Sequence, residues 1–146
     1  MSDTTSSSLA QLNSFLRGEL SAVETYYDAL RSVSGPDTRA ALEDCARSHE
    51  LRVQCLRDAI ARMGGTPARG SGAWGTFAGL VEAGARAFGG RAAVSALARG
   101  EDRGLDDYRG NLRRLDGQGK ELVERLLLPA QERTRRAIHD VRRLLS

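Results

Sequence analysis

The amino-acid sequence predicts an all-α protein, a bundle of four helices. Leucine, alanine and arginine, which favour helices, are abundant among the 146 residues, while β-branched residues are sparse and aromatic residues make up only 5%. Hydrophobic residues recur every three to four positions along four long segments, which is the period of an amphipathic helix. We expect one domain, because a chain of this length can bury a sizeable core without disulfides or a structural metal.

Turn sequences separate the four predicted helices, which cover residues 6–33, 37–63, 91–115 and 120–145. Ser-Gly-Pro-Asp at 34–37 ends the first helix and starts the second, and Gly64-Gly65 ends the second. Asp-Gly-Gln-Gly at 116–119 is a tight turn before the last helix, in which Pro129 is expected to cause a kink or a restart. The expected buried stripe of the first helix contains Leu9, Leu12, Leu16, Leu20, Val23, Tyr27 and Leu30.

The segment 64–90 differs in composition from the helices, since it holds nine of the sixteen glycines. Around Trp74 and Phe77 it has a short apolar stretch, for which we expect one short helix that covers an end or a side of the core. An amphipathic turn that touches a membrane is the alternative interpretation. A short loop, a long crossover and another short loop between helices of similar length is the connectivity of a ferritin-like four-helix bundle.

Three polar residues lie within apolar helical stripes, one on each of three predicted helices: Glu19, His49 and Glu101. Glu19 and His49 are at similar distances from the turn at Gly35, so they lie at the same height in the hairpin. Counting from the turn at Gly117 puts residues 131–134 level with Glu101. Because buried carboxylates and imidazoles need partners, we expect one shared polar layer.

A metal ion is one way to satisfy such a layer. Two glutamates and a histidine suit iron, manganese or zinc, so the predicted metal site comprises Glu19, His49, Glu101 and Gln131. The alternative is that the same side chains are satisfied by hydrogen bonds without a metal, with donors from Tyr26, Tyr27 or Tyr108.

Cys45 and Cys55 are predicted to be free thiols. They are ten residues apart on one helix, about 15 Å along its axis, and cannot form a disulfide there. Free thiols and the polar N-terminus predict a cytoplasmic location. No segment reaches the roughly 18 apolar residues of a membrane span. Cys45 precedes His49 by four residues, so it is either a neighbouring ligand or a small core residue.

The formal charge of +3 and the arginine pairs near the C-terminus are compatible with nucleic-acid binding. Acidic residues are interspersed among the arginines, and the basic C-terminal segment has no aromatic residue to stack on bases. A solvated helix face is therefore the favoured interpretation, and a nucleic acid is not the expected partner.

The stretch Leu-Asn-Ser-Phe-Leu-Arg-Gly-Glu-Leu-Ser-Ala-Val-Glu-Thr-Tyr-Tyr at 12–27 resembles the first helix of bacterioferritins and rubrerythrins. The whole chain is similar to a group of uncharacterised bacterial ferritin-like proteins through Gly-Ala-Trp-Gly at 72–75, Gly-Glu-Asp at 100–102 and Leu-Pro-Ala-Gln at 128–131. The resemblance implies that Glu19, His49 and Glu101 match ligands of a di-iron centre.

The chain departs from that di-iron pattern at two helices. Ala46 stands three residues before His49, where the pattern has glutamate, and Gln131 and Thr134 stand where it has glutamate and histidine. His139 is about five residues from the layer and points elsewhere on its helix. The remaining donors suit one metal ion rather than two.

Two main hypotheses follow for the function, and the sequence does not decide whether the protein is an enzyme. The first is a cytoplasmic ferritin-like bundle with a single-metal or degenerate metal site and a redox or oxidative-stress role. The second is a non-enzymatic structural or interaction bundle with a metal-free network of Glu, His and Tyr side chains. In either case we expect a homo-oligomer, with a dimer as the first guess.

Overall fold

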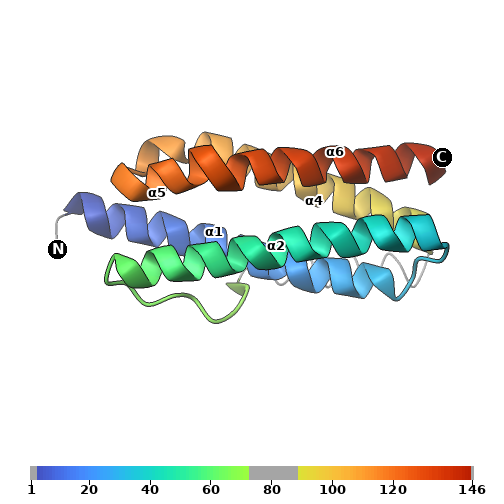
Figure 1. The fold of residues 1–146 in the computed structure, drawn as a ribbon, viewed down its shortest axis with the longest axis horizontal. Coiled ribbons are helices and arrows are strands. Elements are labelled where there is room, and N and C mark those ends of the chain that lie inside the picture. Colours follow the sequence, from blue (N-terminus) through green and yellow to red (C-terminus); the bar gives the residue numbers. More distant parts are fainter. Residues whose placement is uncertain (1–2, 73–88, 146) are drawn as a thin grey trace.

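The computed structural model describes residues 3–72 and 89–145, and these residues form an all-α bundle, as the sequence predicts (Figure 1). The helices of the described part are α1 (Asp3–Leu30), α2 (Pro36–Arg62), α4 (Gly90–Gly110), the short 3-10 helix η2 (Leu112–Arg114), α5 (Gly117–Leu122), the π-helix η3 (Val123–Leu127) and α6 (Leu128–Leu145). The short helix expected around Trp74 and Phe77 lies outside the described residues.

Two antiparallel hairpins stack on each other to make the bundle. In Figure 1, α1 and α2 form one layer, and α4 and α6 form the other. The turn between α1 and α2 is short because Gly35 adopts a φ of 91°, which other residues rarely do, and Pro36 then starts α2 at a position where its missing N–H costs nothing. α2 ends and α4 begins at opposite ends of the bundle, so the two hairpins are joined by a long connection, as expected.

The last helical rod is irregular just before Pro129. Proline lacks an N–H, and its ring collides with the carbonyl group four residues earlier, here that of Arg125. The π-helical turn η3 widens the helix over Val123–Leu127, so the rod continues into α6 without a break. The irregularity expected at Pro129 is thus a π-helical turn, and beyond it α6 buries Gln131 and Thr134.

The apolar core consists of two separate clusters. One contains Tyr26, Leu30, Leu42, Val94 and Ile138, among others, and lies toward the α1–α2 turn. The other contains Leu12, Leu16, Leu56, Ile60 and Leu127, among others, and lies toward the opposite end. Six buried polar residues belong to neither cluster and lie between the two along the sequence of each helix: Glu19, His49, Arg52, Glu101, Gln131 and Thr134.

The buried face of α1 is rotated from the predicted stripe. Tyr27, expected in the core, is 48% exposed, whereas Tyr26 is 2% exposed. The buried side includes Phe15, Glu19 and Tyr26 because α1 packs against α4 as well as α2. Glu19 therefore lies well inside the bundle, as its expected place in the polar layer requires. Within the described residues, none of the helices has the length and apolar character needed to cross a membrane.

A buried polar layer as candidate functional site

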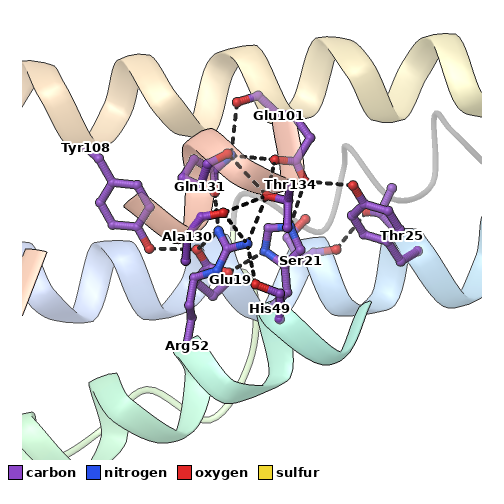
Figure 2. Close-up of polar contacts among 12 residues, drawn as sticks. Glu19, Ser21, Thr25, His49, Arg52, Glu101, Tyr108, Ala130, Gln131 and Thr134 are labelled. Atoms are coloured by element: carbon purple, nitrogen blue, oxygen red, sulfur yellow. Dashed lines mark hydrogen bonds and ion pairs between the residues drawn. The ribbon is translucent and has the colours of Figure 1, made fainter. Parts of the chain in front are cut away.

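A layer of six polar side chains crosses the middle of the bundle, with every long helical rod contributing. Each of the six residues is at most 5% exposed: Glu19 on α1, His49 and Arg52 on α2, Glu101 on α4, and Gln131 and Thr134 on α6. Figure 2 shows these side chains converging between the helices. The shared layer predicted from the heights of Glu19, His49 and Glu101 is confirmed, and Arg52 is a further member outside the predicted set.

His49 bridges the two buried glutamates. Its Nδ1 lies 2.5 Å from Glu19 Oε2, and its Nε2 lies 2.7 Å from Glu101 Oε1. A carboxylate only accepts hydrogen bonds, so both ring nitrogens donate and the imidazole is held in its doubly protonated, positively charged form. The histidine therefore supplies one of the positive charges of the layer.

Arg52 supplies the second positive charge. From α2 its guanidinium group reaches across to α6, where Nη1 donates to Gln131 Oε1 and Nη2 lies 2.9 Å from Thr134 Oγ1 (Figure 2). Nη1 also lies 3.3 Å from Glu19 Oε1. One guanidinium group thus links α1, α2 and α6.

Glu101 is held on its other side by α6. Gln131 Nε2 donates to Glu101 Oε2 at 2.8 Å and to the Glu101 backbone carbonyl at 2.9 Å, and Thr134 Oγ1 donates to Glu101 Oε2 at 2.8 Å. This contact requires Gly104 on α4, because a Cβ atom there would lie 2.7 Å from Gln131 Nε2. The glycine next to the layer therefore makes room for a side chain of the layer itself.

Two tyrosines complete the hydrogen bonding in a reciprocal pattern. Tyr26 of α1 donates to Glu101 of α4 at 2.6 Å, and Tyr108 of α4 donates to Glu19 of α1 at 2.6 Å. Each glutamate precedes the tyrosine of its own helix by seven residues, so α1 and α4 carry the same Glu-x6-Tyr spacing. The two hairpins thus share this pair of residues at the same spacing. No other sequence repeat between them is convincing.

The surrounding charges keep both glutamates ionised. Burial by itself raises the pKa of a carboxyl group, but Arg52 and His49 outweigh it and lower the pKa of Glu19 to about 2. The pKa of Glu101 is also lowered, against the effect of burial, chiefly by His49. Burial and the neighbouring carboxylates raise the pKa of Tyr26 and Tyr108 well above 10, so both tyrosines stay protonated donors.

The positively charged forms of His49 and Arg52 are stabilised by their pairing with the same glutamates. Burial lowers the pKa of a histidine, yet Glu19 and Glu101 more than compensate, and the pKa of His49 is raised above 6.5. Glu19 likewise outweighs burial at Arg52, whose pKa is raised. Two carboxylates and two cations give the layer zero net charge, which avoids the large cost of burying an unpaired ion.

Cys45 and Cys55 are both free, as predicted. Cys45 is buried beside the layer, and burial, followed by the Glu101 carboxylate, raises the pKa of its thiol to about 12. A thiol with such a pKa stays protonated at neutral pH and is not a nucleophile. Its burial fits the interpretation as a small core residue.

The predicted metal ligands meet, but not around a common point. Glu19 and Glu101 contact different nitrogens of the His49 ring, and these two nitrogens point in different directions, so one ion cannot take the place of both contacts. Gln131 directs its Nε2 donor at Glu101 and its oxygen at Arg52. In the described residues, no group of three or more His, Cys, Asp or Glu side chains is arranged to hold a metal ion. The donor set in this arrangement does not fit a metal, and the metal site stays a prediction.

A signal for Arg52 was present in the sequence. Position 52 is seven residues after Cys45 and four before Leu56, so it lies on the buried stripe of α2. An arginine at such a position needs a buried anion, and Glu19 and Glu101 were already candidates.

Fold and site together define the class of this protein, an all-α helical bundle with a buried, charge-neutral polar layer. The chain belongs to a family described as a domain of unknown function (DUF2383), whose sequence pattern matches residues 7–114. The match includes Glu19, His49, Arg52 and Glu101 but ends before Gln131 and Thr134. Comparison with curated proteins and with solved structures gives no significant match.

Proposed function

We propose that the protein is a non-enzymatic structural or interaction bundle, in which the polar layer fixes the four helical rods in register without a metal. The observation that carries this proposal is the buried guanidinium group of Arg52, which pairs with Glu19, Gln131 and Thr134. Buried polar groups are best attested as devices that specify register and orientation rather than as sources of net stability.

The hydrogen bonding of the layer supports this role. All four carboxylate oxygens of Glu19 and Glu101 accept hydrogen bonds from side chains of the same chain. The donors come from α1, α2, α4 and α6, so rotation or sliding of one rod breaks contacts to the others. The proposed location is a reducing compartment such as the cytoplasm, because both cysteines are free.

The predicted metal site is the competing proposal. It is favoured by the convergence of Glu19, His49 and Glu101 in one layer, and by the resemblance to ferritin-like proteins. A divalent ion would add two positive charges to a layer that is already neutral, so the layer stays neutral only if both the His49 proton and the Arg52 cation leave it.

Metal analysis of the full chain, purified without chelators, separates the two. Elemental analysis is expected to find no stoichiometric transition metal, and added Fe²⁺, Mn²⁺ or Zn²⁺ is expected to leave the melting temperature unchanged. A stoichiometric metal that disappears in His49→Gln and remains in His139→Gln would contradict the metal-free layer. The His139 variant is the matched control, because His139 pairs with Asp102 outside the layer.

A further inference from the structure

The guanidinium group of Arg52 contacts a set of five oxygen atoms that we name the cation cradle. Its members are Glu19 Oε1, Ser48 Oγ, Ala130 O, Gln131 Oε1 and Thr134 Oγ1, which belong to α1, α2 and α6. The contacts to Ser48, Thr134 and the carbonyl of Ala130 all run from Nη2, at 3.0, 2.9 and 3.5 Å. The cradle therefore surrounds the terminal part of the side chain.

The stem of Arg52 takes no part in this recognition. Nε, the nitrogen that joins the guanidinium group to the stem, is buried without a hydrogen-bond partner among the described residues. All polar contacts of the side chain are made by the two Nη groups. A free guanidinium ion in the same place would keep every one of these contacts and has no stem to order.

Charge and shape select the kind of cation. Glu19 is the single carboxylate in the cradle, and its other members are neutral oxygens arranged around the two Nη groups. A planar cation with one delocalised charge and several N–H donors matches this set better than a small ion with a fixed coordination shell does.

We infer that the cation cradle is a binding site for guanidinium-type cations in its own right, which the chain fills with its own Arg52. Truncation of that side chain then opens a site for a free guanidinium ion. The inference rests on the proposed function only in that the layer holds no metal, and it adds the class of ligand that the layer accepts.

The experiment is chemical rescue of Arg52→Ala. Guanidinium chloride up to about 50 mM, far below the molar concentrations that unfold proteins, is expected to raise the melting temperature of this variant saturably by about 5 °C. Sodium chloride and urea at the same concentrations are expected to give no such rise. The wild type and Arg47→Ala, which removes an exposed arginine of the same helix, are expected not to be stabilised.

Three outcomes would overturn the inference: no rise with guanidinium, an equal rise with urea or sodium chloride, or a rise with Mn²⁺ instead. If Arg52→Ala does not fold, nuclear magnetic resonance of the wild-type arginine side chains decides. Arg52 held in the cradle is expected to give separate, slowly exchanging Nη–H signals, unlike exposed Arg47. Averaged Arg52 signals would refute the cradle. Metal bound to the wild type contradicts the proposed function, whereas failed rescue in a metal-free protein contradicts this inference alone.

Discussion

Glu101 and Asp102 are consecutive residues of α4, and each pairs with one of the two histidines, but in different surroundings. The Glu101 side chain is 2% exposed and contacts His49 at 2.7 Å, whereas the Asp102 side chain is 43% exposed and contacts His139 Nε2 at 2.9 Å. Asp102 also lies 2.6 Å from Arg135 Nε. Similar groups at similar distances are thus found on two sides of one helix.

The difference lies in burial and in the number of elements involved. Side-chain partners of Glu101 come from α1, α2 and α6, while Arg135 and His139, which pair with Asp102, both belong to α6. Water and salt screen the Asp102 pairs, which limits their contribution to stability. In the buried layer, loss of one charge leaves its partners unpaired in a medium of low dielectric constant. Distance alone therefore says little about the energetic weight of an ion pair.

The largest expected effect comes from Glu101→Gln, which keeps the shape of the side chain and removes its charge. It leaves His49 and Arg52 with one carboxylate, and we expect the free energy of unfolding to fall by about 3–5 kcal/mol in urea denaturation. A loss below about 1 kcal/mol would show that the buried layer behaves like a surface pair.

The second-largest effect is expected from acid, which lowers the free energy of unfolding by protonating the buried layer. The pKa of Glu19 is lowered from 4.5 to about 2 in the folded protein, so its contribution is present above pH 4.5 and is lost as the pH falls toward 2. Its lowered pKa corresponds to about 3 kcal/mol. Urea titrations between pH 5 and 2 measure the loss, and the same slope in Glu19→Gln would contradict this assignment.

As the pH rises, the stability contribution of His49 is expected to be lost, whereas that of Glu19 is lost as the pH falls. Because the pKa of His49 is raised in the folded protein, its contribution is complete below pH 6.5 and is lost as the pH rises through the raised value. We expect the free energy of unfolding of the wild type to decline over this range and that of His49→Gln to lack this component. Equal alkaline profiles of the two proteins would show that His49 is not the titrating group.

Removal of one tyrosine hydroxyl group has a smaller expected effect. Tyr26→Phe and Tyr108→Phe each delete a hydrogen bond to a buried carboxylate and are expected to cost about 1.5–3 kcal/mol. Tyr27→Phe is the matched control, since Tyr27 follows Tyr26 on α1 and donates to Glu50 at the surface. Thermal unfolding of the three variants should separate the first two from the third.

Asp102→Asn is expected to have the smallest effect, at most about 1 kcal/mol at low salt. Added sodium chloride should shrink the difference from the wild type further, because the Asp102 pairs are open to solvent. The effect of Glu101→Gln should persist at the same salt concentration. If both variants respond to salt alike, the contrast between the two sides of α4 does not hold.

Local pattern was sufficient to predict most of the fold. The helix positions followed from hydrophobic period and turn residues. The structure ends the third helix at Gly110, before the 3-10 helix η2, and adds the π-helical turn before Pro129 to the last. Counting residues from the turns also placed Glu19, His49 and Glu101 at one height. Both inferences depend on the constant rise and rotation per residue of an α-helix.

The same reasoning failed where rotation about the helix axis mattered. The period of the first helix places Tyr27 in the buried stripe, whereas Tyr26 is the buried residue and hydrogen-bonds to Glu101. The hydrophobic period alone does not single out Arg52, because a long charged side chain usually lies at the surface. Its side chain is long enough to reach α6, and its partners on α1 and α6 come from 33 to 82 residues away in the sequence.

The sequence by itself determined that the chain forms a helical bundle and that three polar residues share a layer. These features arise from interactions between residues a few positions apart, which the periodic pattern records. Only the tertiary structure decided what satisfies the layer: His49 between two glutamates, Arg52 in its cradle and two tyrosines that pair reciprocally. Such pairings depend on how neighbouring helices are rotated and on side-chain conformation, and neither is encoded in the period of one helix.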